Sequence, residues 1–183
     1  QKGLVEQLPK NLSQALSLVE EQMTQIVEEK EIIHQIVNDF LPTTRNAFFI
    51  GRGIDYAVAL EAALKLKEIS YIQAEGFAAG ELKHGTIALI ETGTPVIGLI
   101  TDDATASHTR GNLEEVRSRG AKTIVLTKKS LAQTTDRFIL PDAPDYLMSL
   151  IAILPLQLLA YYASFERGYD VDKPRNLAKS VTV

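Results

Sequence analysis

The sequence predicts an α/β domain of three layers, with helices on both faces of a mainly parallel sheet of about five strands. One observation is a set of short, continuous apolar runs, of which Ala47–Ile50, Pro95–Ile100 and Thr123–Thr127 are the clearest. Strands that are apolar at every position are typical of parallel sheets covered on both faces. The second observation is that segments of helical length separate these runs, as parallel connections require.

The elements can be assigned in order along the 183 residues. The apolar spacing of residues 4–40 predicts lead-in helices, and Leu41-Pro42-Thr43-Thr44 ends them. The polar, basic stretch after Gly168 has the composition of a frayed terminus. Between these ends we expect strands at 47–50, 95–100, 123–127 and 137–140, and helices at 57–71, 104–119 and 146–165.

The last of these helices, from Tyr146 to Phe165, approaches the ~20 apolar residues that span a bilayer. Ser149, Pro155 and Gln157 interrupt the run, and no basic cluster flanks it on one side. A buried core or interface helix is therefore the better interpretation, and we expect no membrane span.

Composition excludes several classes of protein. Hydrophobic residues make up 45% and charged residues 23% of the chain, which are globular values, and the net charge of -4 argues against nucleic acid as a partner. The absence of cysteine excludes disulfides, thiolate metal sites and a cysteine nucleophile, and is consistent with the cytoplasm. Because the chain begins at Gln1 without a leader-like apolar segment, we expect a fragment of a longer protein that is not secreted.

The turn Gly51-Arg52-Gly53 joins the first apolar strand to the following helix. In an open parallel sheet such a junction lies at the carboxyl end of the strand, where ligands gather. The turn lacks the third glycine of a dinucleotide fingerprint and the Gly-Lys-Ser/Thr ending of a phosphate-binding loop. Both nucleotide interpretations are rejected.

The helix over residues 57–71 carries the most informative charges. Glu61, Lys65 and Glu68 fall within a sector roughly 60° wide, because successive helical residues turn by about 100°. The rest of the circumference is almost entirely apolar, which predicts a helix in the interior. Charges there must be paired, open to a cleft or completed by a ligand. An ordinary structural pair between Glu61 and Lys65 is the alternative.

Two other residues are candidates whose interpretation stays open on the residues alone. Glu81 and His84 have the spacing of half a metal site, but the chain has only three histidines and no second cluster, so we expect no metal. His84 then suits either a loop acid or base or an ordinary surface histidine. His34 looks incidental, and Lys179 in the tail would by default be solvated.

Several motifs together resemble one family. The segments ALKLKEISY (63–71), AGELKHG (79–85) and DKPRNLAKSVTV (172–183) resemble the carboxyl-terminal part of the glutamine–fructose-6-phosphate amidotransferases (isomerizing), also called glucosamine-6-phosphate synthases. The similarity runs from about Phe48 to Val183. The synthase half of this family has two sugar isomerase (SIS) modules, and the chain resembles the second. This resemblance implies lead-in helices at 1–44, a SIS domain at 45–168 and an active-site tail at 169–183.

The resemblance implies roles for five residues. Glu68 matches the base that moves a proton between C1 and C2 of the open-chain sugar imine. Lys65 matches a neighbouring lysine that supports this step and binds the substrate. Lys179 corresponds to the lysine that forms a Schiff base with the sugar, and Ala178 to a backbone contact with the sugar. His84 corresponds to the histidine that assists ring opening from across a subunit boundary. No metal or organic cofactor is implied.

The resemblance also implies partners. These are the sugar phosphate, a second copy in a homodimer, the first SIS module and a glutaminase domain that needs an amino-terminal cysteine absent from this chain. Because the family's phosphate-binding loops lie in the first module, we expect the isolated chain to be inactive or weakly active. The alternative function is a non-catalytic SIS module that binds a sugar phosphate. Such a sensor would not need the trio of Glu68, His84 and Lys179.

Overall fold

A computed structural model describes Pro9 and residues 11–176 of the chain. It contains a five-stranded, entirely parallel sheet in the order β2-β1-β3-β4-β5, as the apolar runs predict. The strands are β1 (Asn46–Gly51), β2 (Gln73–Ala78), β3 (Pro95–Ile100), β4 (Lys122–Lys128) and β5 (Phe138–Leu140). The longer helices are α2 (Leu12–Glu28), α3 (Lys30–Phe40), α4 (Ile54–Ser70), α5 (Ala106–Arg117) and α6 (Met148–Phe165).

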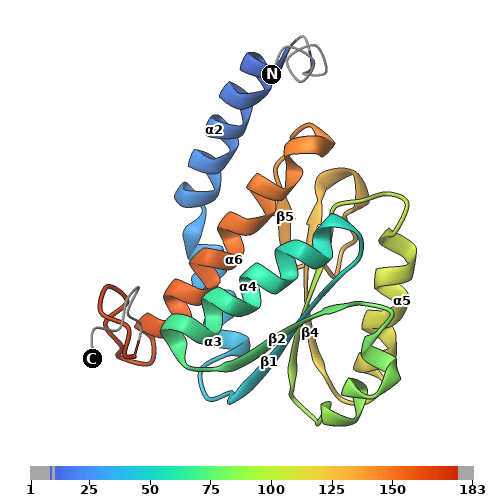
Figure 1. Ribbon diagram of the computed structural model, residues 1–183, viewed down its shortest axis with the longest axis vertical. Helices are drawn as coiled ribbons and strands as arrows, with labels where there is room; N and C mark the ends of the chain where they lie inside the picture. The colour runs from blue at the N-terminus through green and yellow to red at the C-terminus, as the bar shows by residue number, and fades with distance from the viewer. Residues whose placement is uncertain (1–8, 10, 177–183) are drawn as a thin grey trace, which may run out of the picture.

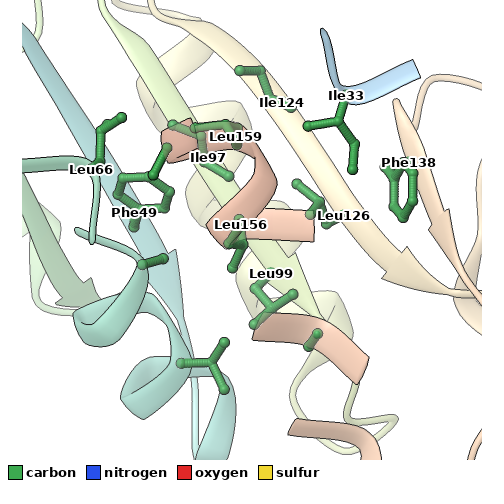
Figure 2. Close-up of a cluster of buried hydrophobic side chains, with 14 of the residues drawn as sticks. Ile33, Phe49, Leu66, Ile97, Leu99, Ile124, Leu126, Phe138, Leu156 and Leu159 are labelled. Atoms are coloured by element: carbon green, nitrogen blue, oxygen red, sulfur yellow. The ribbon is translucent and has the colours of Figure 1, made fainter. Parts of the chain in front are cut away.

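The helices form layers on both sides of the sheet (Figure 1). One face is covered by α4 and α6, which pack along each other, with α3 beside α6. The larger hydrophobic core lies under them, and Phe49, Leu66 and Leu156 are among its members (Figure 2). The smaller core lies on the opposite face, where Phe48 and Ile50 belong to one hydrophobic cluster with Leu113 and Val116 of α5. The three-layer prediction is confirmed.

Helix α6 is the one helix in the described part of the chain that is long and apolar enough to cross a membrane. Its span, Asp145–Phe165, has a mean hydropathy of 1.7, but 56% of its most apolar window is buried inside the protein. Pro155, Leu156 and Leu159 are buried within it. The interpretation as a core helix therefore agrees with the packing.

The lead-in segment differs from one continuous pattern because it is broken at Glu29, where α2 ends and α3 begins. Glu29 has φ −87° and ψ 12°, which leaves the α-helical region and changes the direction of the chain. α3 packs against α6, whereas α2 extends beyond the body of the domain (Figure 1). The break expected at residues 41–44 is present between α3 and β1.

Strand β2 is the element whose position the sequence analysis missed. Its sequence, QAEGFA, contains no β-branched residue, and only Ala74 is fully buried because the strand lies at the edge of the sheet. At Gly76 there is no room for a side chain. A Cβ atom there would lie 2.9 Å from the backbone carbon and oxygen of Ala59 on α4, so β2 and α4 are in direct backbone contact.

Because Gly76 is at this contact and Gly111 is in open space, alanine substitutions at the two positions should change the stability in opposite directions. Gly76→Ala should lower the free energy of unfolding by about 1–3 kcal/mol, because backbone atoms must move to admit the methyl group. Gly111→Ala, in the interior of α5 with no atom within 4 Å of the new Cβ, should raise it by up to about 1 kcal/mol. Urea unfolding of the chain measures both. Equal effects of the two substitutions would contradict the close approach of β2 to α4.

Candidate active site

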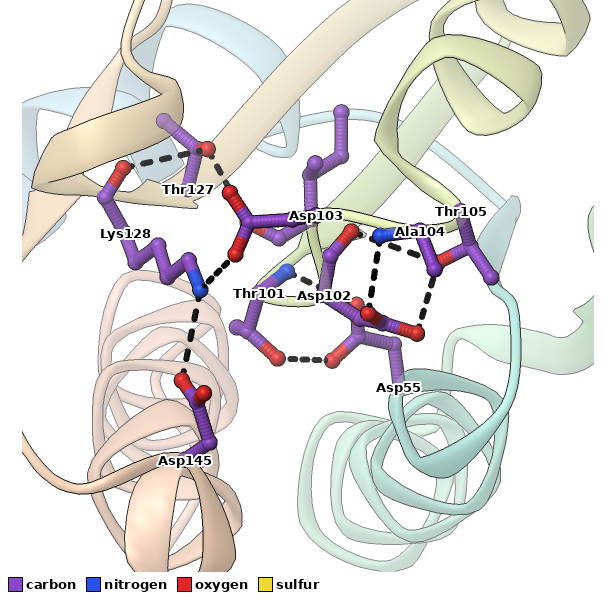
Figure 3. A network of polar contacts seen from close by, with 10 residues as sticks. Asp55, Thr101, Asp102, Asp103, Ala104, Thr105, Thr127, Lys128 and Asp145 are labelled. Atoms are coloured by element: carbon purple, nitrogen blue, oxygen red, sulfur yellow. Dashed lines mark hydrogen bonds and ion pairs between the residues drawn. The ribbon is translucent and has the colours of Figure 1, made fainter.

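The carboxyl ends of β1 and β3 form the topological switch point of the sheet, since α4 and α5 leave these neighbouring strands towards opposite faces. Gly53 has φ 57° and ψ −127°, a conformation that favours glycine, and it starts α4. Asp55 then reaches back across the switch point. Its carboxylate accepts a hydrogen bond from the Thr101 backbone N–H at 2.8 Å and another from the Thr101 hydroxyl (Figure 3).

The switch point is acidic. Asp55 is only 1% exposed, and burial raises its pKa, while the hydrogen bonds from Thr101 act in the opposite direction. Asp102 follows Thr101, and Lys128 forms ion pairs with Asp103 and, at 3.3 Å, with Asp145 (Figure 3). Carboxylates repel a phosphate group, which binds best to backbone N–H groups and cations. The carboxylates at this edge, where ligands were expected after the Gly51-Arg52-Gly53 turn, therefore oppose the binding of a sugar phosphate.

The aligned charges of α4 lie on its outward side. Lys65 Nζ is 2.8 Å from Glu68 Oε2 and 3.6 Å from Glu61 Oε1, so the predicted alignment is confirmed. Lys65 thus pairs with both carboxylates: the structural pair with Glu61 is present, and Glu68 is the closer partner. The hydrogen bond to Glu68 raises the pKa of Lys65, although partial burial acts against it.

The prediction that α4 is buried all round is wrong. Leu60 and Leu64 are 44% and 41% exposed, on the same side as the charges. The reason is that α4 packs closely through its small residues, Ala59, Ala62 and Ala63, which leaves the opposite side of the helix open. The ion pair of Lys65 and Glu68 is thus accessible to a ligand, with the Glu68 side chain 27% exposed.

The tail returns to the end of α4, next to this pair. Ser164 near the end of α6 donates a hydrogen bond to the Ile69 carbonyl at 2.9 Å. Beyond α6, the ring of Tyr169 meets the ring of Tyr71 edge-on at 4.7 Å, and the Arg175 backbone N–H donates to the Tyr71 hydroxyl at 2.9 Å. The described part of the tail, from Tyr169 to Arg175, therefore lies beside the helix end that carries Glu68 (Figure 1). Ala178 and Lys179 lie outside the described residues.

His84 is not brought to the pair of Lys65 and Glu68. It lies in the short 3-10 helix Leu82–His84, with its side chain 60% exposed and Nδ1 3.5 Å from Glu81. Glu68 precedes the start of β2 and His84 follows its end, and a strand of 6 residues is about 20 Å long. Within residues 9 and 11–176, no group of three or more His, Asp or Glu side chains is placed to hold a metal ion.

His34 is not incidental, contrary to the expectation from its polar surroundings. Its ring stacks on Tyr162 at 4.5 Å, and Nε2 is 2.5 Å from Glu166 Oε1, so it connects α3 to the end of α6. The hydrogen bond with Glu166 raises the pKa of His34. The next residue, Arg167, donates a hydrogen bond to the Leu41 carbonyl at 3.1 Å. These contacts fix the point from which the tail leaves.

Comparison with known proteins places this architecture. The SIS domain family matches residues 41–167, which is most of the chain. The chain belongs to the SIS domain family. This match extends from the end of α3 to two residues beyond α6, and so includes the whole sheet and α4.

The chain is similar to curated proteins named glutamine–fructose-6-phosphate aminotransferase (isomerizing). The protein of that name from Listeria innocua is 59% identical over 181 residues, which is 99% of this chain and 30% of the relative. The one from Lactiplantibacillus plantarum is 60% identical over 173 residues, 94% of this chain and 29% of the relative. The chain thus spans about 30% of the length of the curated relatives it matches.

Solved structures agree. The C-terminal domain of glucosamine-fructose-6-phosphate aminotransferase from Francisella tularensis superimposes with a TM-score of 0.81 at 34% identity, covering 89% of this chain and 47% of that one. A glucosamine-6-phosphate deaminase from Thermotoga maritima has a TM-score of 0.72 at 23% identity, covering 99% of this chain and 52% of that one, and shows the same fold.

The buried carboxylate at the switch point predicts a pH-dependent stability. A group whose pKa is raised on folding makes the folded state less stable as the pH rises from its ordinary pKa of 3.8 through the raised value. Relative to the parent, Asp55→Asn should therefore gain stability as the pH is raised from about 4 to about 7. Thr101→Val removes a donor that stabilises the carboxylate and should steepen the pH dependence of the chain. Urea unfolding at several pH values tests both, and a difference between Asp55→Asn and parent that does not change with pH would contradict the account.

Proposed function

We propose that the chain is the second sugar isomerase module of a glutamine–fructose-6-phosphate aminotransferase (isomerizing), which converts fructose 6-phosphate to glucosamine 6-phosphate. The observation that carries this proposal is the 2.8 Å pair of Lys65 and Glu68 on the open side of α4, beside the root of the tail that bears Lys179. The relatives with this name match nearly the whole chain, which supports the same assignment.

The proposed chemistry needs one amine and one carboxylate. The amine of Lys179 adds to the C2 carbonyl of the open-chain sugar, and water leaves to give the Schiff base. Ammonia then replaces the lysine nitrogen at C2. Glu68 takes a proton from C1 and returns it to C2, while the O1 hydroxyl proton ends on nitrogen. The carbonyl is then at C1 and the amine at C2, with all atoms conserved.

The geometry of α4 suits Glu68 to this step. The ammonium of Lys65 holds Oε2, and among the described contacts Oε1 has no hydrogen-bond donor, so that oxygen can face a substrate. Lys65, which stays protonated, can also bind the substrate by attracting the negative charge that develops at O1.

The rest of the site comes from partners in this proposal. The carboxylates of the switch point oppose phosphate binding, which supports a phosphate site in the first SIS module and a weak or absent activity of the chain alone. The separation of His84 from Glu68 supports its action in the site of the neighbouring subunit of a homodimer. Ala178 contributes a backbone contact to the sugar. The glutaminase domain supplies ammonia, and the reaction needs no metal, organic cofactor or nucleic acid.

We assign the enzyme to the cytoplasm, where its sugar-phosphate substrate and a chain without cysteine are both expected. The alternative function, a sugar-phosphate sensor without catalysis, is less well supported. A sensor of this fold would bind the phosphate at the switch point, and here that edge holds Asp55, Asp102 and Asp103.

The proposal predicts a loss of turnover when the base is neutralised. In the full-length enzyme, Glu68→Gln should lower kcat for glucosamine 6-phosphate formation by at least about 10³-fold and change sugar-phosphate binding little, because the amide cannot accept the C1 proton. Glu61→Gln on the same side of α4 is the matched control and should lose less than about tenfold. Kinetics with binding by calorimetry measure both effects. Undiminished turnover of Glu68→Gln, or an equal loss in both variants, would contradict the role of Glu68.

A further inference from the structure

Tyr71, the residue that ends α4, has an unusual backbone conformation. Its φ of 60° and ψ of 16° are left-handed, a conformation that is unfavourable for an L-residue and usually selects glycine at a helix end. In the described residues only Tyr71 and Asn176 combine a positive φ with a side chain. Because glycine would suit the backbone at position 71 better, the tyrosine must be explained by the contacts of its ring.

The ring of Tyr71 receives the tail on two sides. The guanidinium carbon of Arg175 lies 4.0 Å from the ring centroid, within the range of a cation–π contact. Tyr169 meets the ring edge-on at 4.7 Å with an interplanar angle of 64°. The Tyr71 hydroxyl accepts the Arg175 backbone N–H at 2.9 Å. A single side chain at the end of α4 thus contacts the tail at its beginning and at its last described turn.

This contact is the main attachment of residues 170–176. The hydrogen bonds that Asp172 and Lys173 donate go to Asp170, within the tail itself. Among the described hydrogen bonds, the one from Arg175 to Tyr71 alone joins this stretch to the rest of the domain. Most of the stretch is exposed, so little hydrophobic burial holds it in place. Removing the Tyr71 side chain should therefore release the tail from α4.

We infer that Tyr71 is a positioning residue that fixes the tail against α4 and so brings the amine of Lys179 to the carboxylate of Glu68. The inference rests on the proposed function. Tyr71 follows Glu68 by three residues, and Arg175 precedes Lys179 by four. The contacts of Tyr71 with Tyr169 and Arg175 therefore hold the described part of the tail at the helix end that carries Glu68.

The test uses Tyr71→Gly in the full-length enzyme, because glycine suits the left-handed backbone and should keep the fold. We expect kcat to fall about 10- to 100-fold, the effect of a misplaced catalytic group, with little change in the KM for fructose 6-phosphate. Reduction with borohydride should trap the sugar on Lys179 more slowly by a similar factor. The melting temperature should stay within a few degrees of the parent.

Two further variants separate positioning from a general structural role. Tyr71→Phe keeps the ring that Tyr169 and Arg175 contact and should lose less than about tenfold in kcat. Arg175→Gln removes the cation, and in a double-mutant cycle Tyr71→Gly with Arg175→Gln should be no worse than the poorer single variant. Multiplying losses in the double variant, or a large fall in melting temperature for Tyr71→Gly, would overturn the inference.

The possible failures are distinguishable. Wild-type rates of turnover and trapping in Tyr71→Gly would overturn the positioning role and leave the proposed function intact. Absence of any sugar adduct on Lys179 in the unmodified enzyme, after borohydride reduction with fructose 6-phosphate, would instead overturn the Schiff-base role in the proposed function, and the inference with it.

Discussion

The close packing of the small side of α4 on the sheet decides which residues of this helix remain accessible. Ala59, Ala62 and Ala63 bring the helix so near that Gly76 of β2 meets its backbone, and the charged residues are left on the outward side. There the ammonium of Lys65 holds the carboxylate of Glu68 at 2.8 Å. The end of the helix, the start of the tail and the proposed base are consequently in one place, although the tail begins 101 residues after Glu68 in the sequence.

The carboxyl ends of the strands, at the other end of α4, are acidic. In an open parallel sheet the switch point is where ligands usually bind. Here the buried carboxylate of Asp55, at the start of α4, accepts a hydrogen bond from Thr101 at the end of β3, and Lys128 is paired with acidic side chains. This arrangement stabilises the junction and discourages an anion. In the proposed function, the module contributes helix α4 and the tail to catalysis, and another part of the longer protein binds the phosphate.

Most of the fold could be predicted because its signals are local. Continuous apolar strands and helical spacing identified four of the five strands and the three-layer class, and the periodicity of α4 aligned Glu61, Lys65 and Glu68. Strand β2 was missed because an edge strand needs few apolar residues. The stacking of His34 on Tyr162 and the contact of Tyr71 with Arg175 join residues more than 100 positions apart, so no local pattern could show them. The roles of His84 and Lys179 came from the family motifs alone.

In the proposed enzyme, this module holds part of a site that His84 of a neighbouring subunit completes. The most direct measurement mixes two inactive full-length variants, Glu68→Gln and His84→Ala, and allows their subunits to exchange. If His84 acts in its neighbour's site, each mixed dimer has one site with both residues intact, and random pairing restores about a quarter of wild-type turnover. If the mixture stays as inactive as either variant although mixed dimers have formed, both residues act within one chain, and the account is contradicted.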